Sequence, residues 1–162
     1  MSTTAAVEQL TVRRATAADT QTIVALYEGL SPESRHSRFF LPIPRITTAL
    51  REQLADVERA AIWLAFDGDT CVGEARIAPS ARQSCADLAV TIADHYQNRG
   101  IGEHLARVAV AEHLETGSCV EFSILPTNAA ANRLARRNHL QLHLDSGIVV
   151  GRIHSRRQQR HA

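Results

Sequence analysis

The sequence predicts an α/β (α+β) fold, a single domain with a mixed central sheet of about six to seven strands flanked by about four to five helices. Three observations support this prediction. The chain has 162 residues, which is the size of one globular domain with one core. Its apolar residues change repeatedly between a strand-like and a helical period. The middle of the chain then follows the order strand, strand, strand, helix, strand, helix, strand, which favours a mixed sheet.

The first third of the chain is predicted to form one strand and three helices. Residues 10–14 are a short strand. Residues 16–19 supply helix-capping side chains ahead of an i, i+3, i+4 apolar stripe, which predicts the first helix. Ser31 as N-cap and Pro32 at the first helical position begin the second helix. A third helix, 47–57, follows a proline-containing turn.

Strands dominate from residue 60 onward. The segments 61–66 and 71–77 read as a hairpin around a tight Asp-Gly-Asp turn. An apolar strand is predicted at 86–93, and a helix at 101–116 is stopped by Gly117. The remaining predicted elements are a strand at 120–125, a short basic helix at 128–138 and a hairpin at 140–153 that turns through residues 145–147.

The domain is expected to span residues 10–153, between a flexible N-terminus, 1–9, and an Arg-rich C-terminal tail, 154–162. The first residues are small and polar and lack the charged and apolar regions of a signal or transit peptide. No segment approaches the roughly 20 apolar residues of a membrane span. We therefore expect a cytoplasmic protein without a membrane partner.

Charge gives no indication of a nucleic-acid partner. Eighteen basic residues, all of them arginine, nearly balance 17 acidic residues, for a net charge of +1. Dedicated nucleic-acid binders carry a basic footprint that this balance lacks. Because lysine is absent, the chain has no lysine side chain of its own to acylate.

The cysteines and histidines predict neither a redox pair nor a metal site. Cys71, Cys85 and Cys119 are too widely spaced for a CxxC motif. We expect them to be reduced, buried thiols, as is usual in the cytosol. None of the eight histidines pairs as HxxxH or HExxH, so no metal is expected.

A glycine-containing loop at a helix N-terminus is the most informative motif. The strand at 86–93 continues through residues 94–96 into Gln97, then Gly100 and Gly102, and directly into the next helix. Glycine allows a tight turn and a close ligand approach, and a helix N-terminus offers unpaired N–H groups with a positive dipole end. Together they predict a phosphate site. The spacing fits neither GxGxxG nor the P-loop, which indicates another pyrophosphate-bearing cofactor.

This Gln-x-x-Gly-x-Gly pattern between a strand and a helix resembles the acetyl-CoA signature of the GNAT superfamily of N-acetyltransferases. The resemblance covers nearly the whole chain, since the predicted elements follow the order of that fold. Two segments are closer still to the catalytic domain of bacterial Pat-type protein lysine acetyltransferases. Residues 30–40 resemble their Ser-Pro-Glu-Ser…Arg-Phe-Phe segment, and residues 86–94 are similar to their Ala-Glu-x-Ala-x-Thr-Val-x-Asp strand.

The resemblance implies acetyl-CoA as cosubstrate, without a metal. Backbone groups of one strand should pair with the pantetheine arm, the loop and helix start should hold the pyrophosphate, and a helix-heading Asn should contact the arm. These residues are Val90, Thr91 and Ile92; then Gln97, Asn98, Arg99, Gly100, Ile101 and Gly102; and Asn128. A backbone N–H near Thr91 or Ile92 would polarise the thioester carbonyl.

The resemblance places Asp87 where Pat-type enzymes carry a catalytic Glu. A lysine amine with a pKa of about 10.4 is almost fully protonated at neutral pH, so a general base is useful. Asp87 would need partial burial to raise its pKa, or a water relay, because Asp is one methylene shorter than Glu. Glu74 and Glu121 are the alternative bases.

Three positions depart from the family pattern. Ala135 stands where many GNAT enzymes place a Tyr that protonates the departing thiolate, and His139 and Leu140 replace the usual Gly and Phe. A CoA thiolate is a fair leaving group, so a missing acid is compatible with catalysis. The missing acid is equally compatible with a protein that transfers the acetyl group slowly or not at all.

Other residues have both a structural and a functional interpretation. Tyr96 fits a packing aromatic better than an acid, and Tyr27 fits the core or a cleft wall. The segment around Arg35, Arg38, Phe39 and Phe40 is either an amphipathic helix or part of the acceptor site. The basic face of Arg133, Arg136 and Arg137 is either solvated or close to the 3′-phosphate of CoA.

The expected function is transfer of an acetyl group from acetyl-CoA directly to an amine, with a protein lysine as the acceptor on the Pat-type resemblance alone. A small-molecule amine acetyltransferase would use the same cofactor half. A catalytically weak acyl-CoA-binding module is the alternative from another class. A monomer and a homodimer are both compatible with the sequence.

Overall fold

The computed structural model describes residues 9–80, 85–116 and 119–155. Most of the predicted N-terminal segment and tail therefore lie outside the described residues. The helical elements are η1 (Ala17–Asp19), α2 (Thr20–Glu28), α3 (Pro32–Phe39), α4 (Thr48–Ala55), η2 (Asp94–Tyr96), α5 (Ile101–Thr116) and α6 (Ala129–Arg137). The strands are β1 (Thr11–Arg14), β2 (Ala61–Asp67), β3 (Thr70–Ala78), β4 (Ala86–Ile92), β5 (Cys119–Ile124), β6 (Leu142–Asp145) and β7 (Ile148–His154).

Within the described residues, the strands form one seven-stranded sheet in the order β1-β2-β3-β4-β5-β7-β6. Every neighbouring pair is antiparallel except β4 and β5, which are parallel. The predicted mixed α/β sheet is therefore confirmed. The single parallel pair arises because α5 connects β4 to β5 as a crossover.

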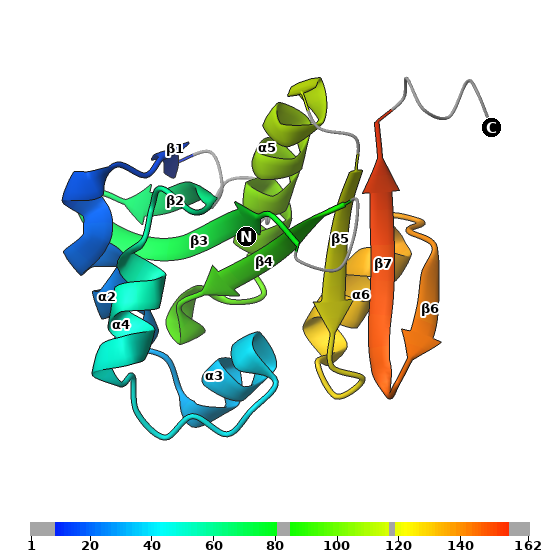
Figure 1. Ribbon diagram of the computed structural model, residues 1–162, viewed down its shortest axis with the longest axis horizontal. Helices are drawn as coiled ribbons and strands as arrows, with labels where there is room; N and C mark the ends of the chain where they lie inside the picture. The colour runs from blue at the N-terminus through cyan, green and yellow to red at the C-terminus, as the bar shows by residue number, and fades with distance from the viewer. Residues whose placement is uncertain (1–8, 81–84, 117–118, 156–162) are drawn as a thin grey trace.

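Helices cover both faces of the sheet (Figure 1). The helices α2, α3 and α4 lie on one face, and α5 and α6 lie on the other. The core on the α5 side includes Trp63, Leu105 and Ala109, which are at most 2% exposed. The core on the α2 side includes Ile23 and Leu64, both fully buried.

The strands β4 and β5 are paired only where they begin. Their register runs from Ala86 opposite Val120 to Leu88 opposite Phe122 and ends there. Beyond it the two strands diverge, and α3 lies at the open end (Figure 1). On its other edge, β4 pairs with β3 from Asp87 to its end at Ile92. The second half of β4 thus has one strand neighbour and one free edge.

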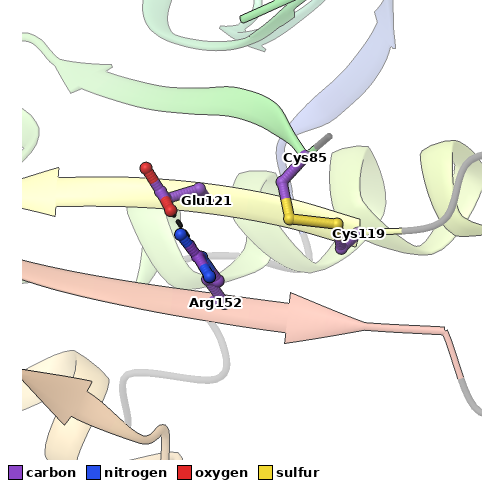
Figure 2. Close-up of a disulfide and its surroundings, with 4 residues drawn as sticks. All are labelled: Cys85, Cys119, Glu121 and Arg152. Carbon is purple, nitrogen blue, oxygen red and sulfur yellow. Dashed lines mark hydrogen bonds and ion pairs between the residues drawn. A yellow bond between two sulfur atoms is a disulfide. The ribbon is translucent and has the colours of Figure 1, made fainter. Parts of the chain in front are cut away.

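A disulfide closes the paired end of β4 and β5, which corrects the expectation of three reduced thiols. Cys85 and Cys119 immediately precede and begin these strands, and their Cα atoms are 4.7 Å apart (Figure 2). Both residues are buried, as expected, at 3% and 4% exposure. They are 34 residues apart in sequence, and only the parallel pairing brings them together. Cys71 remains a free, half-buried thiol.

Candidate active site

The loop between β4 and α5, together with the first turn of α5, forms a candidate anion-binding nest. Asn98 and Gly100 both have left-handed backbones, with φ values of 59° and 82°. Left-handed residues in a turn can direct successive N–H groups toward one side. The first intrahelical bond of α5 runs from the His104 N–H to the Gly100 carbonyl, 3.1 Å. The N–H groups of the first turn, at residues 101–103, precede that donor, so they have no acceptor within the helix and form the positive end of its dipole.

Gly102 acts in the packing of α5 against the sheet. A Cβ atom at this position would lie 3.5 Å from Cγ1 of Ile92 and 3.7 Å from Cγ1 of Val90. The missing side chain therefore faces β4. Close packing of α5 on the strand is therefore one reason for a glycine here, and a contact of the Gly102 backbone with a phosphate stays a prediction. Gly100 is the glycine whose conformation requires it.

The free edge of β4 presents the backbone groups of Val90 and Ile92. The N–H of Ala93 donates to the carbonyl of Val72, at the end of the β3 pairing, 2.9 Å. Because backbone groups alternate in direction along a strand, the Thr91 amide also faces β3, where its register partner is Glu74. Val90 and Ile92 face the opposite edge. Thr91 is therefore not available as a backbone partner of the pantetheine arm, which corrects that part of the expectation.

The side chain of Gln97 lies at the end of this free edge and contacts its last residue, Ile92. Its Nε2 atom donates to the Ile92 carbonyl at 3.1 Å and to Oγ of Ser34 at 2.9 Å. The next cation in the loop, Arg99, lies over the ring of Tyr96, 5.0 Å from its centroid. Tyr96 in turn donates to Asp67 at 2.9 Å. Tyr96 is therefore a packing aromatic, as the sequence favoured.

Asn128 caps α6, as the sequence predicted. Its Oδ1 atom accepts the N–H of Ala131 at 3.1 Å, and its carbonyl accepts Nδ2 of Asn132 at 2.8 Å. A contact between Asn128 and the cofactor arm stays a prediction. Glu103, in the first turn of α5, accepts hydrogen bonds from Arg137 and Asn138 at the end of α6. This contact joins α6 to the helix that begins at the nest.

Asp87 and Glu121 are opposite each other in the register of β4 and β5. Asp87 is exposed, whereas Glu121 is 7% exposed and accepts a hydrogen bond from Nε of Arg152 at 2.5 Å (Figure 2). Partial burial raises the pKa of the Asp87 carboxyl; a hydrogen bond with Ser80 opposes that rise, and the charge of Glu121 adds to it. Asp87 therefore has the raised pKa that a base requires, and Glu121 is engaged in an ion pair.

Glu74 is buried beneath this face. It is 1% exposed, its Oε1 atom accepts from the Tyr27 hydroxyl at 3.1 Å, and Arg76 donates to the same atom at 2.8 Å. Within the described part of the chain, its Oε2 atom has no hydrogen-bond partner. Burial of both Tyr27 and Glu74 closes this carboxylate to an incoming amine. Of the three candidate bases, Asp87 alone is exposed.

The positions that depart from the family pattern are structurally distinct from one another. Ala135 is 3% exposed, so the α6 position of the usual Tyr faces the interior. His139 has a left-handed backbone with φ of 54°, a conformation that glycine adopts without strain. The Gly that the family carries there is therefore explained by the backbone, and His139 keeps the same conformation.

Comparison with known proteins decides the family. The model of the acetyltransferase (GNAT) family matches residues 23–139, which includes the nest, β4 and Asn128. The chain belongs to the GNAT family of acetyltransferases. The family uses acetyl-CoA, and the free edge of β4 that leads to an anion-binding nest fits a cosubstrate with a peptide-like arm and a pyrophosphate.

Individual GNAT relatives agree with this assignment. The chain is 34% identical over 113 residues to the Pseudomonas aeruginosa protein named Acetyltransferase PA5475, a match that covers 66% of this chain and 59% of that protein. The chain thus spans about three fifths of the length of this curated relative. Among solved structures, the GNAT domain of S. lividans PAT has a TM-score of 0.77 at 23% identity and covers 88% of this chain and 89% of that one.

A second solved structure, yncA from Salmonella typhimurium with its cofactor acetyl-CoA, has a TM-score of 0.72 at 16% identity and covers 90% of this chain and 94% of that chain. Both structural matches concern the fold. Among the residues described here, no helix is long and apolar enough to cross a membrane. The same part of the chain contains no group of three or more His, Cys, Asp or Glu side chains arranged to hold a metal ion.

Proposed function

We propose that this chain transfers the acetyl group of acetyl-CoA directly to an amine, and that the acceptor is a lysine side chain of a protein. One observation carries the proposal: β4 combines a free backbone edge, an anion-binding nest at its end and an exposed carboxylate near its beginning. Membership of the GNAT family supports acetyl transfer, and the segments that resemble Pat-type enzymes support a protein lysine.

The backbone of β4 and α5 would hold the cosubstrate. The groups of Val90 and Ile92 would pair with the amides of the pantetheine arm, as an added strand would. The nest around Gly100 and the first N–H groups of α5 would bind the pyrophosphate. When bound, acetyl-CoA supplies an acyl thioester that an amine can attack.

Asp87 would act as the general base. The acceptor amine is largely protonated at neutral pH and must lose a proton to attack the thioester. The Asp87 carboxylate takes this proton directly or through one water. Its raised pKa makes it a stronger base than an ordinary Asp, which follows from partial burial and from the nearby charge of Glu121.

A backbone N–H on the free edge would stabilise the charge that develops on the thioester oxygen. The amides of Val90 and Ile92 face that edge, so one of them is the donor that we propose, in place of Thr91. A fixed dipole that faces developing charge does not have to reorient during the reaction. Position 135 is an alanine where many family members have the acidic Tyr, so the thiolate would leave without that acid.

The proposal is tested by acetyl transfer to a panel of acceptors. Release of free CoA thiol would be measured with small amines, lysine peptides and purified proteins, and acetylated sites would be mapped by mass spectrometry. The chain has no lysine, so every acetyl-lysine belongs to the added acceptor. Transfer to protein lysines supports the proposal. Transfer to small amines alone would assign the enzyme to them, and acetyl-CoA binding without any transfer would indicate a binding module.

We also propose that the protein works in the cytoplasm, as a monomer or a homodimer. In that compartment thiol reductants keep most cysteines reduced, so the disulfide between Cys85 and Cys119 would be in exchange with them. Cell fractionation and light scattering test the two statements.

A further inference from the structure

Polar contacts hold α3 in place. Pro32–Phe39 contains no buried residue, and its apolar packing is made by the partly buried Phe39, whose ring centroid lies 5.7 Å from that of Tyr27. The helix nevertheless lies against β4 at the open end of the sheet (Figure 1). With one apolar anchor near its C-terminal end, the start of the helix depends on a small number of directional contacts.

The first contact joins the start of α3 to the residue that follows β4. The Asp94 carboxylate accepts the N–H of Ser31 at 2.9 Å, the hydroxyl of Ser31 at 2.6 Å and the hydroxyl of Ser34 at 2.7 Å. Ser31 is also the N-cap of α3, since its Oγ atom accepts the N–H of Ser34. One carboxylate thus fixes the whole first turn of the helix.

The same hydrogen-bond network reaches the phosphate-binding loop. Oγ of Ser34 accepts a hydrogen bond from Nε2 of Gln97, and that nitrogen also donates to the Ile92 carbonyl on the free edge of β4. Ser34 therefore bridges Asp94 and Gln97. The start of α3, the end of β4 and the loop before α5 form one connected unit.

Through the two serines, the hydrogen bonds of this network run toward the Asp94 carboxylate. Each serine hydroxyl accepts a hydrogen bond from nitrogen, so its own proton is free to go to Asp94. The carboxylate must then be ionised, because all its contacts are with donors. Partial burial alone would raise the pKa of Asp94, but the hydrogen bonds from Ser31 and Ser34 outweigh it and lower the pKa.

The other half of α3 is tied to the same strand. Nε of Arg38 donates to the Tyr27 hydroxyl at 3.2 Å, and the hydroxyl of Thr91 donates to the same oxygen at 3.2 Å. Because side chains alternate along β4, Thr91 and Asp87 face the same side of the sheet, the side of α2 and α3. The helix α3 therefore borders the face from which Asp87 is exposed.

We propose that Asp94 is a positioning residue, which through Ser34 and Gln97 couples occupancy of the phosphate-binding loop to the position of α3 at the acceptor side. This inference rests on the proposed function. A bound cosubstrate would restrain the loop that carries Gln97, and the hydrogen-bond network would transmit that restraint to the helix. Asp94 itself touches neither substrate, so its effect is on acceptor binding through α3.

The inference is tested by hydrogen–deuterium exchange of residues 32–39 with and without CoA, in Asp94→Asn, Ser34→Ala and the wild type. In Asp94→Asn an NH₂ group meets one of the serine donors whichever way the amide turns. Asp69→Asn is the control, because Asp69 is exposed in the hairpin turn. Binding of CoA should slow exchange in α3 about fivefold or more in the wild type and in Asp69→Asn.

In Asp94→Asn this slowing should be lost, and α3 should exchange faster even without CoA. In Ser34→Ala only the slowing should be lost, since the bonds between Asp94 and Ser31 remain. The Asp94→Asn enzyme should show a KM for the acceptor raised about fivefold or more, with kcat and the Kd of CoA within about threefold of wild type.

CoA that binds to the wild type without changing exchange in α3 would overturn the coupling and leave the proposed function untouched. The coupling would also be overturned if CoA slowed exchange in α3 of both Ser34→Ala and Asp94→Asn as much as it does in the wild type. If Asp94→Asn does not fold, Ser34→Ala carries the test. Failure of CoA to bind to the wild type would contradict both proposals, whereas coupling without turnover on any amine would contradict the proposed function alone.

Discussion

The two ends of the β4–β5 pair are built in different ways. At the beginning of the strands, backbone pairing, the disulfide and the ion pair between Glu121 and Arg152 hold them together. At the other end the strands separate, and side-chain hydrogen bonds such as those of Asp94 and Gln97 replace strand pairing. Covalent and backbone contacts thus fix the end that carries Asp87, whereas the end proposed to bind the cosubstrate is open.

The difference shows how one strand can combine rigidity and access. The first half of β4 carries Asp87, and its position is fixed by neighbours on both edges. The second half keeps β3 on one edge and offers backbone groups on the other. A base and an acyl-binding edge are then part of one rigid element, which favours catalysis because the reacting groups are held in a fixed relation.

The largest expected effect is that of Asp87→Ala, which should lower kcat/KM about 10²–10⁴-fold, the usual contribution of a general base. The Kd of acetyl-CoA should barely change. The loss should shrink as pH rises toward the amine pKa of about 10.4, where the acceptor loses its proton without help. Rate profiles from pH 6 to about 10 would measure this.

Asp87→Glu is the matched variant and should retain activity, since the extra methylene shortens the path to the amine. If the wild-type and Asp87→Ala profiles stay parallel across pH, or if the variant is as fast as the wild type, the base is another group. Positioning of the two substrates would then account for the rate.

The second expected effect concerns the closed end of the strand pair. Cys85→Ser/Cys119→Ser, or reduction of the wild type, should lower the free energy of unfolding by about 2–4 kcal/mol, because the bridge closes a long loop. The Kd of acetyl-CoA should stay within about threefold, since the nest lies at the other end of β4. Denaturant unfolding and calorimetric titration would measure the two quantities.

Cys71→Ser is the matched control for that variant. Cys71 is a free thiol, and burial raises its pKa to about 11, so it is a poor nucleophile for exchange. Its replacement should change stability by less than about 1 kcal/mol. Equal stability of the reduced and oxidised proteins would show that strand pairing alone holds the closed end.

The third effect distinguishes the two glycines of the open end. Gly100→Ala should weaken acetyl-CoA binding about tenfold or more, because alanine with a positive φ costs about 1–2 kcal/mol and the free loop relaxes away from the nest. Gly102→Ala should bind nearly as well as the wild type, since its Cβ atom would make ordinary contacts with Val90 and Ile92. Calorimetric titration of both variants would show the difference, and equal loss in both would contradict the separate roles.

The sequence predicts the elements well because local signals decide them. Ser31, Thr47 and Asn128 were expected at helix starts, and each accepts a capping hydrogen bond from the backbone. The helix 101–116 agrees residue for residue, and the signals that predicted it are a glycine loop before it and a glycine after it in the sequence. Local chemistry of this kind needs no knowledge of the tertiary structure.

Long-range contacts could not be predicted in this way. The disulfide joins residues 34 apart, and the bonds between Ser31 and Asp94 join residues 63 apart. Both depend on the parallel pairing and on the placement of α3, which no local pattern encodes. The packing of Gly102 against β4 could not be predicted for the same reason, because the sequence shows a missing side chain but not the direction in which it would point.

The smallest expected effect is that of Glu121→Gln, which removes a charge opposite Asp87 and keeps the shape of the side chain. The negative charge of Glu121 raises the pKa of Asp87, so its removal should lower that pKa. Asp87 acts as a base when ionised, and kcat/KM rises with pH as it loses its proton. A lower pKa therefore moves this rise to lower pH. At pH values above this rise, where Asp87 has lost its proton in both proteins, activity should stay within about threefold of wild type. Arg152 is partly exposed and can be hydrated when the pair is broken, so the fold should tolerate the change.

The pH profile of kcat/KM of Glu121→Gln, compared with that of the wild type, is the measurement. A loss of activity as large as that expected for Asp87→Ala would instead make Glu121, in place of Asp87, the base at the closed end of the strand pair.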